Sequence, residues 1–338
     1  MRASKRFGPA GERARGASRV ARKGGLVGRS GQLALLGLAS LLLGCSFGSP
    51  VRAPAGVARP SVLPTLAPRT GTPTPMPTTY LTATATRTAT AVVTPSPAPT
   101  EEPLTLTILY DNYAINESLR TGWGYACLLE RGDLRILFDT GADALTLLAN
   151  MEGLGVDTDG LDAIILSHNH SDHVGGLDGI LASNHGVSVY APQAFASRLA
   201  ALLGDKAQVV AVAEAVSIAP GVHSTGEMGR SIAEHALVVE TSDGLVVITG
   251  CAHPGIVEMV AQAQQVAGGP VDLVIGGFHL SGEGATRIGT IIEDLRGLGV
   301  RRVAPTHCSG DLARRLFAEA YGDDYVEAGV GLRLQLAP

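Results

Sequence analysis

The sequence predicts an α/β (α+β) fold in which helices cover β-sheets. Of its 338 residues, 45% are hydrophobic, so the chain can bury at least one sizeable core. From Leu104 onward, short apolar runs bounded by Gly and Asp indicate strands, and helical stretches lie between several of them. The 43 glycines and the aromatic content of 4% suit a compact fold of small side chains with tight turns.

The expected elements follow in order from the first strand, LTLTILY at 104–110. YACLLE at 125–130 and LRILFD at 134–139 are strands joined by an RGD turn, and the helix at 142–155 ends at glycine. Further strands are expected at 161–167, 187–191, 207–213, 236–242, 244–250, 271–277 and 301–305. Helices are expected around 192–203, 254–267, 285–298 and 310–321. We therefore expect one domain over 104–338.

Two segments precede this domain. Residues 1–44 read as a lipoprotein-type signal peptide, with a basic region up to Arg29 and an uncharged stretch at 33–44. That stretch is shorter than the roughly 20 residues of a membrane-spanning helix. LLGC at 42–45 resembles a bacterial lipobox, which implies a lipidated Cys45; a simple secreted or tethered form is the alternative. Residues 45–103 hold 12 of the 19 prolines and 13 threonines, which predicts a disordered tether.

The charge is distributed unevenly along the chain. Residues 1–44 carry nine Lys/Arg against Glu12 alone, a balance of +8, so the net charge of −5 leaves −13 for the remainder. An acidic surface is a poor one for nucleic acid, and no nucleic-acid partner is expected. We expect a small-molecule partner and a chain tethered to the outer side of the cytoplasmic membrane through Cys45.

Six of the nine histidines lie where four apolar runs end. His168, His170, Asp172 and His173 follow DAIIL, Cys251 and His253 follow GLVVITG, His279 follows VDLVIGGF, and His307 follows RRVAPT. Independent placement would rarely produce such a grouping. The other histidines, His185, His223 and His235, are expected at turns or on the surface, and the three remaining cysteines, Cys127, Cys251 and Cys308, do not form a disulfide framework.

The grouped residues predict a metal site. In an extended segment, His-x-His sends both imidazoles to one side, because side chains alternate along a strand, and the Asp-His pair that follows can turn toward a second ion. Neutral imidazole and carboxylate ligands suit Zn, Fe or Mn. Two ions about 3.5–4 Å apart can share a hydroxide that attacks an electrophile. One or two divalent ions, in the first place Zn, are therefore expected.

The motif His-x-His-x-Asp-His at 168–173 resembles the signature of the metallo-β-lactamase superfamily. ILFDTG at 136–141 is similar to the preceding strand and turn of that superfamily, in which Asp139 supports the metal loop. The resemblance implies an αββα sandwich over 104–338 with the metals at one edge. Four further motifs resemble one subgroup of that superfamily, the 7,8-dihydropterin-6-methyl-4-(β-D-ribofuranosyl)aminobenzene 5'-phosphate synthases. They are DN at 111–112, TGCAHPGI at 249–256, GGFHL at 276–280 and THCSG at 306–310.

The same resemblance implies roles for individual residues. His168, His170 and His253 would hold one ion, and Asp172, His173 and His307 the other. Where many members have TGD with a bridging Asp, this chain has TGC, so Cys251 either bridges as a thiolate or packs beside the ligands; a thiolate favours zinc over manganese. Asp172 and His279 are the catalytic candidates, and His279 is alternatively a ligand, a substrate contact or a hydrogen-bond donor to a ligand.

The leading hypothesis is an exported metal-dependent hydrolase that uses a metal-activated water on a small-molecule ester, phosphoester or lactone. The alternatives are a synthase-like transferase, whose substrates would be cytosolic, and a non-catalytic lipoprotein that binds a ligand in its metal pocket. An anionic substrate is expected because the helix starts at Ser309–Gly310 and in HLSGEGATRIG offer free N–H groups, although ordinary N-capping is the more common role of such residues. Asn112 and Glu117 are expected near the mouth of the site.

Overall fold

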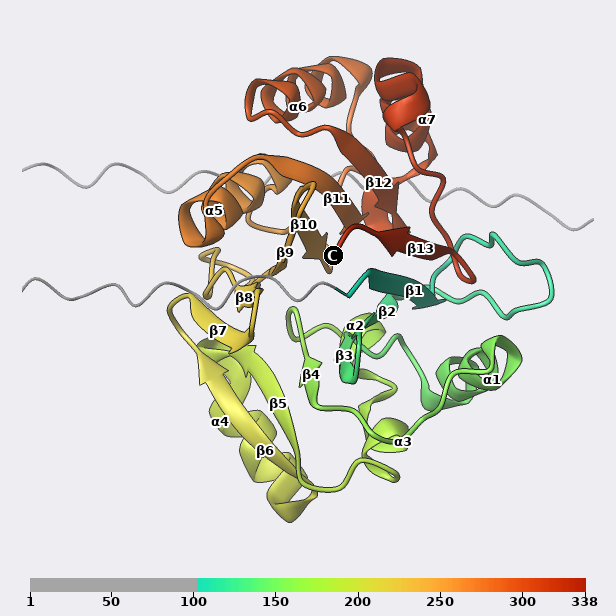
Figure 1. Ribbon diagram of the computed structural model, residues 1–338, viewed down its shortest axis with the longest axis vertical. Helices are drawn as coiled ribbons and strands as arrows, with labels where there is room; N and C mark the ends of the chain where they lie inside the picture. The colour runs from blue at the N-terminus through green and yellow to red at the C-terminus, as the bar shows by residue number, and fades with distance from the viewer. Residues whose placement is uncertain (1–101) are drawn as a thin grey trace, which may run out of the picture. The chain divides into compact units, whose positions relative to one another are not determined.

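Two β-sheets packed face to face form the centre of the computed structural model, which describes residues 102–338. Helices lie against both outer faces of this pair (Figure 1). The αββα arrangement confirms the predicted fold class. The predicted signal peptide at 1–44 and the predicted tether up to residue 101 lie outside the described residues.

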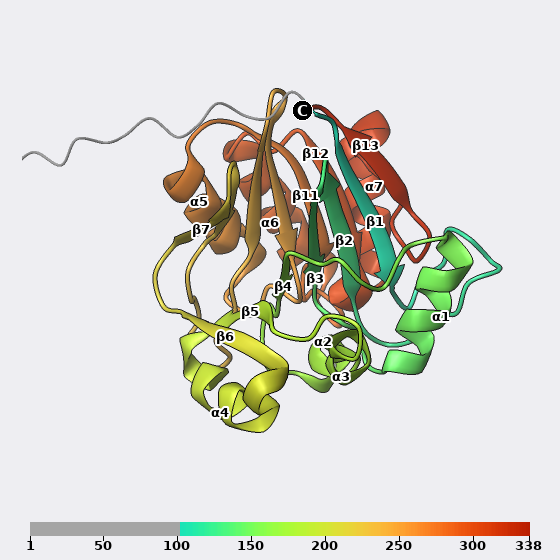
Figure 2. The ribbon, with the colours of Figure 1, turned by 60° about the horizontal axis from the view of Figure 1, so that its bottom comes forward.

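The first sheet has seven strands in the order β13-β1-β2-β3-β4-β5-β6. They are β1 (Leu104–Tyr110), β2 (Ala126–Arg131), β3 (Leu134–Phe138), β4 (Ala163–Ile165), β5 (Val187–Pro192), β6 (Ala207–Val212) and β13 (Arg333–Leu336). Pairing is antiparallel from β13 to β3 and parallel from β3 to β6. β13, β1 and β2 run side by side at one edge of the sheet (Figure 2).

The second sheet has six strands in the order β12-β11-β10-β9-β8-β7. They are β7 (Val216–Ala219), β8 (Val222–Ser224), β9 (Leu237–Thr241), β10 (Gly244–Thr249), β11 (Val271–Gly277) and β12 (Arg302–Thr306). β10, β11 and β12 are parallel neighbours, so their carboxyl ends meet at the same edge of the sheet. The three loops that carry Cys251, His279 and His307 therefore begin next to one another.

Side-chain alternation explains how the central strands are buried on both faces. On β10, Val246 and Ile248 point into the interior between the two sheets, whereas Leu245 and Val247 point toward the helices outside the second sheet. A strand covered on both faces has a continuous apolar sequence, as GLVVIT does. The same property makes these strands rigid supports for the loops that follow them.

Seven α-helices are present in the described residues. α1 (Ala144–Leu154), α3 (Leu177–Leu181) and α4 (Gln193–Leu203) cover the first sheet, α5 (Ile256–Ala267), α6 (Ala285–Gly297) and α7 (Asp311–Tyr321) cover the second, and α2 (Ser171–Val174) is a single turn. None of the helices in residues 102–338 combines the length and the apolar character needed to cross a bilayer. Short 3₁₀ turns occupy 204–206, 307–309 and 322–324.

The structure contains every strand and helix that the sequence predicts, with shifted bounds. The strand expected at 161–167 is only Ala163–Ile165, and the helix expected from 254 begins at Ile256. β7, β8 and β13 were not predicted, because runs of three or four residues are too short to show alternation. α2 and α3 were missed for the same reason.

Phe317 on α7 is expected to be a main contributor to the packing behind the site. It is fully buried, and its ring meets that of Phe278, the residue before His279, edge to face at 5.5 Å. We expect Phe317→Ala to lower the free energy of unfolding by about 3–5 kcal/mol, measured by urea denaturation. The exposed Arg315 on the same helix is the control, and Arg315→Ala should change the free energy of unfolding by about 0.5 kcal/mol at most. A loss below about 1 kcal/mol in Phe317→Ala would contradict this packing role.

Candidate metal centre

The four predicted histidine segments meet at one edge of the sandwich. The segment with His168, His170 and His173 follows β4 of the first sheet, whereas the segments with His253, His279 and His307 follow β10, β11 and β12 of the second. His168 and His253 come from opposite sheets, yet their ring centroids are 4.6 Å apart. The centre therefore lies between the two sheets at the edge where the supporting strands end.

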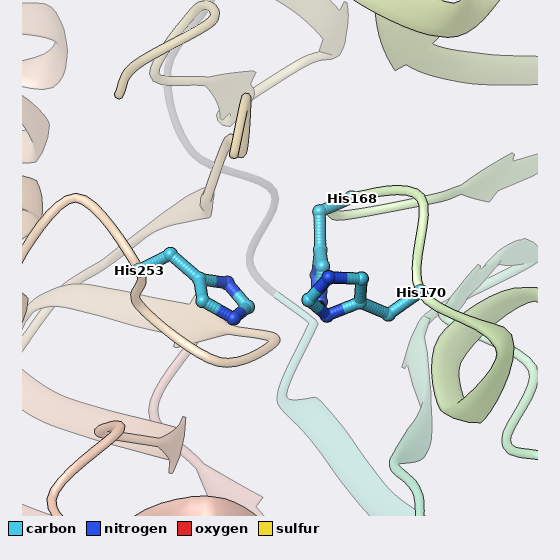
Figure 3. A group of neighbouring side chains, drawn as sticks. All are labelled: His168, His170 and His253. Carbon is cyan, nitrogen blue, oxygen red and sulfur yellow. Dashed lines mark hydrogen bonds between the residues drawn. The ribbon is translucent and has the colours of Figure 1, made fainter. Parts of the chain in front are cut away.

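His168, His170 and His253 form the first group of potential ligands. One nitrogen from each ring lies within 4.8 Å of the corresponding nitrogens of the other two. His168 Nε2 and His170 Nδ1 are 3.0 Å apart, and His253 faces both rings from the opposite loop (Figure 3). The sequence predicted these three residues as one ligand set, and the structure brings them together.

Asp172, His173 and His307 form the second group. The Nε2 atoms of His173 and His307 are 3.2 Å apart, and Asp172 Oδ2 lies 3.7 Å from the first and 3.5 Å from the second. Around a tetrahedral ion with metal–nitrogen bonds of about 2 Å, neighbouring ligand atoms are about 3.3 Å apart. The donor atoms of this group are therefore already spaced as ligands of one such ion.

Cys251 lies between the two groups. Its Sγ is 3.3 Å from His173 Nε2, and together with one nitrogen from His168 and one from His173 it forms a further set within 4.8 Å. The position is compatible with a thiolate bridge. Hydrogen bonding with Cys308, together with burial, raises the pKa of the Cys251 thiol.

Asp139 anchors His173 from behind. Its Oδ2 accepts a bond of 2.7 Å from His173 Nδ1 and one from Ser167 Oγ, while Oδ1 accepts from the Ser167 backbone N–H. Because Nδ1 carries the proton, His173 Nε2 is left with a free lone pair that faces the centre. Burial raises the pKa of Asp139 to about 7. The structure thus gives Asp139 the supporting position that the family resemblance implied.

The rings of His168 and His307 are anchored in the same way. Ser167 Oγ gives its hydrogen to Asp139 and accepts from His168 Nδ1 at 2.9 Å, which leaves Nε2 of His168 free. Asn112 Oδ1 lies 3.1 Å from Nδ1 of His307, and the amide of Asn112 also donates to the His307 carbonyl. Asn112 therefore reaches the site, as expected, whereas Glu117 is exposed.

Glu234 is the supporting residue that sequence reasoning missed. Its fully buried carboxylate accepts the backbone N–H groups of Cys251, Ala252 and His253 at 2.8–2.9 Å and His253 Nδ1 at 2.8 Å. Although burial opposes ionisation, these hydrogen bonds outweigh it and lower the pKa of Glu234. The one sequence signal was an acidic residue at the entry to an apolar strand, in AEHALVVE.

The environment acts differently on the buried histidine rings: it keeps His168 and His173 neutral but favours the protonated form of His307. Burial lowers the pKa of both His168 and His173 to about 3, so both present lone pairs at neutral pH. Burial also acts on His307, but its bond to Asp172 outweighs it and the pKa of His307 is raised. Hydrogen bonding to His307 likewise outweighs burial at Asp172, and the lowered pKa of Asp172 keeps it ionised.

The loops of the centre contain strained backbone. Among the described residues, the non-glycine residues with positive φ are Asp139, Ala252, His279 and His307, at 50–61°. All four lie at this site, and Ala252 lies within the backbone turn that Glu234 holds. Such conformations cost about 1–3 kcal/mol each and persist only where the surroundings enforce them.

A cavity of about 180 Å³ opens beside His253 and His279. Its walls combine the apolar side chains of Ile256, Phe278 and Leu280 with charged ones, namely Glu258, Glu283, Asp294 and Arg287. On the other side of the centre, the ring of Trp123, which is 56% exposed, lies 5.0 Å from the His307 ring. The cavity and the exposed indole thus lie beside different residues of the centre, His253 and His307.

Two of the sequence predictions need correction or refinement at this point. His235 was expected at a turn or on the surface, but it is fully buried, and its ring nitrogens are bonded to Ser224 Oγ and the Leu166 carbonyl. Ser309 was expected to open an anion-binding helix start or to cap the helix. Its buried hydroxyl instead joins the Phe278 N–H to the Thr306 carbonyl, and α7 begins without a side-chain cap.

Comparison with known proteins places this arrangement in a family. Residues 134–308 match the family described as the beta-lactamase superfamily domain. A 7,8-dihydropterin-6-methyl-4-(beta-D-ribofuranosyl)-aminobenzene-5'-phosphate synthase of Methanocaldococcus jannaschii is 32% identical, over 58% of this chain and 83% of the relative. An uncharacterized protein of the same organism is 27% identical, over 61% of this chain and 90% of the relative.

Solved structures show the same fold. The crystal structure of Tm1679, described as a metal-dependent hydrolase of the beta-lactamase superfamily, superposes with a TM-score of 0.57 at 25% identity, over 70% of this chain and all of the other. The metallo-beta-lactamase fold protein YhfI from Bacillus subtilis gives a TM-score of 0.53 at 19% identity, over 69% and 99% of the two chains. On the strength of the matched domain and the close relative, the chain belongs to the beta-lactamase superfamily.

Proposed function

We propose that this chain is an exported metal-dependent hydrolase that acts on an ester, phosphoester or lactone in a small molecule. The observation that carries the proposal is the meeting of two candidate ligand groups in which four of the five histidines have their Nδ1 atom hydrogen-bonded away from the centre, so that Nε2 faces it. A family whose solved members include a metal-dependent hydrolase supports the same reading. Burying so many polar nitrogens without a bound partner would cost free energy in an ordinary protein core.

The donor set fits divalent metal ions. His168, His170 and His253 would hold one ion, and Asp172, His173 and His307 a second, with Cys251 within reach of both groups. Imidazole, carboxylate and thiolate together favour zinc. When bound, such ions supply Lewis-acid polarisation of a substrate oxygen and a hydroxide nucleophile near neutral pH.

The residues around the centre provide the positioning and the proton chemistry. Asp139 and Glu234 hold the rings of His173 and His253, and Asp172, which is ionised and has a side chain 19% exposed, is the proposed catalytic carboxylate. His279 is exposed beside the cavity, and hydrogen bonding to Cys308 raises its pKa. It is therefore suited to donate a proton to the leaving group from the cavity side.

The cavity limits the choice of substrate. The cavity is lined by three carboxylates and one guanidinium, namely those of Glu258, Glu283, Asp294 and Arg287. An anionic reacting group remains a prediction, and it would have to bind at the metals. The rest of the substrate is better matched by hydrogen-bond donors and an apolar surface against Ile256, Phe278 and Leu280.

A second candidate is a transferase related to the dihydropterin synthase. The 32% identity over most of that relative favours it, as do the motifs around Cys251, His279 and His307. Both candidates use the same ligands, so the ligand geometry does not separate them. The proposed export does, because the substrates of that synthase would be cytosolic.

Loss of a ligand should abolish both ion binding and turnover. We expect His168→Ala and Asp172→Ala each to bind one ion fewer per chain, by elemental analysis, and to lose hydrolysis of a phosphodiester and lactone panel. His185→Ala, at an exposed position away from the centre, should keep both. If the wild type binds its ions and holds a small anion tightly but forms no product over hours, the non-catalytic alternative replaces the hydrolase.

Removing the charge of Glu234 should weaken the centre without removing any ligand. We expect Glu234→Gln to lower the affinity for zinc by about 10–100-fold, because outer hydrogen bonds fix the orientation and basicity of a ligating histidine. The matched control is Glu240→Gln, which alters a similar carboxylate–histidine pair, with His223, outside the centre. Equal zinc affinity in both variants, by competition with a chelator, would show that the Glu234 bonds are only structural.

The proposed export can be tested through Cys45. The wild-type chain should fractionate with membranes and require detergent for release, whereas Cys45→Ala should appear in the soluble exported fraction. N-terminal sequencing of the wild type should report a cut before Cys45. An uncut chain in the cytoplasm would remove the export proposal and favour the transferase.

A further inference from the structure

A third cluster of metal-binding side chains lies behind the two groups assigned above. One ligand atom each from Cys251, His279 and Cys308 falls within 4.8 Å of the other two. The three residues follow β10, β11 and β12, which are adjacent parallel strands. Both cysteines are buried, at 4% and 5% exposure, whereas His279 is exposed at the cavity.

The chain is shaped so that these two cysteines approach one another. A Cβ atom at Gly277 would come within 2.3 Å of the Gly250 carbonyl oxygen, 2.7 Å of Cys308 Sγ and 3.2 Å of Cys251 Cα, so only glycine fits beside this loop and the Cys308 sulfur. Cys308 Sγ lies 3.6 Å from the Cys251 carbonyl oxygen, and both thiols are free. The left-handed backbone of His279, with φ of 53°, is a second local cost.

We propose that Cys251, His279 and Cys308 form a separate site for a thiophilic metal ion, such as Zn²⁺, Cd²⁺ or Cu⁺. Two sulfurs and one imidazole are a softer donor set than the histidine and carboxylate groups beside them. Sulfur atoms in a tetrahedral zinc site are about 3.8 Å apart, so closing this cluster requires shifts of about 1 Å or less. The exposed side of His279 leaves a fourth position open toward the cavity.

This site shares Cys251 with the central groups, which gives it a consequence for the proposed hydrolase. An ion held there occupies His279, the residue assigned to leaving-group protonation, and takes Cys251 away from His173. On the basis of the proposed function, occupancy should therefore inhibit turnover. Metal excess would then slow the same protein that metal activates.

Cobalt spectroscopy on the full chain tests the site directly. Reduced, metal-free protein is titrated with Co²⁺ in the absence of oxygen, and sulfur-to-cobalt charge-transfer absorption is recorded with the number of ions bound. We expect Cys308→Ala to weaken this absorption and to bind fewer ions than the wild type. Cys127→Ala, which removes a buried thiol outside the cluster, should match the wild type. Identical spectra for Cys308→Ala and the wild type would overturn the proposal.

His279→Gly provides an independent variant that is expected to fold. Glycine accepts the φ of 53° without strain, and the position is exposed, so the change removes a ligand at little structural cost. It should also bind fewer ions and weaken the charge-transfer absorption. An unchanged spectrum and ion count in this variant would likewise reject the site.

The proposed inhibition and the proposed metal site can be rejected independently of one another. If the wild type is active, excess Zn²⁺ should slow it, and Cys308→Ala should resist that inhibition. If no substrate is turned over, the cobalt result still decides whether the site exists. Normal turnover combined with unchanged cobalt spectra would reject the site and leave the hydrolase in place.

Discussion

The centre depends on hydrogen bonds that fix the proton of four of its five candidate ligand imidazoles, all but that of His170, on the side away from the metal position. Asp139, Ser167, Glu234 and Asn112 each face the Nδ1 atom of one histidine. Without these acceptors the rings would be free to rotate or to carry the proton on Nε2, and the lone pairs would no longer converge. The buried carboxylates thus act on the site through the imidazoles and leave the ligand positions to nitrogen, Asp172 and Cys251.

Apart from Ser167, which directly precedes His168, the fold supplies the acceptors from segments other than those that carry the candidate ligands. Asp139 follows β3, Glu234 precedes β9, and Asn112 follows β1, while the ligands themselves follow β4, β10 and β12. Each of these three loops is therefore tied to a segment next to another strand by at least one side-chain hydrogen bond. This arrangement can hold four left-handed non-glycine residues in place, because the strain is opposed by bonds to rigid strands on both sides.

The candidate ligands were predictable from the sequence, whereas most of their supports were not. The candidate ligands can be recognised in the sequence because histidines are rare and their spacing after apolar runs is specific. They are His168, His170, Asp172, His173, Cys251, His253 and His307. Glu234 lies 17–19 residues before the groups it binds, and a single glutamate in a sequence of ordinary composition does not stand out.

His235 was placed wrongly because a lone histidine is usually exposed, and nothing nearby in sequence reveals Ser224 or the Leu166 carbonyl. The αββα layers followed from periodicity and resemblance, but the short β7 and β8 show no periodicity.

Cys251 stands at the position where the family resemblance implies a bridging aspartate in many members. An aspartate at that position would be a hard ligand, and the neighbouring Cys308 and His279 would then lack a third soft partner. With cysteine, the same loop offers one sulfur to two competing sets, one containing His168 and His173 and the other containing His279 and Cys308. Because a thiolate binds zinc far better than manganese, the substitution links the choice of metal to the choice of set. The Glu234 carboxylate holds the backbone N–H of Cys251, so it fixes the loop from which either set draws the sulfur.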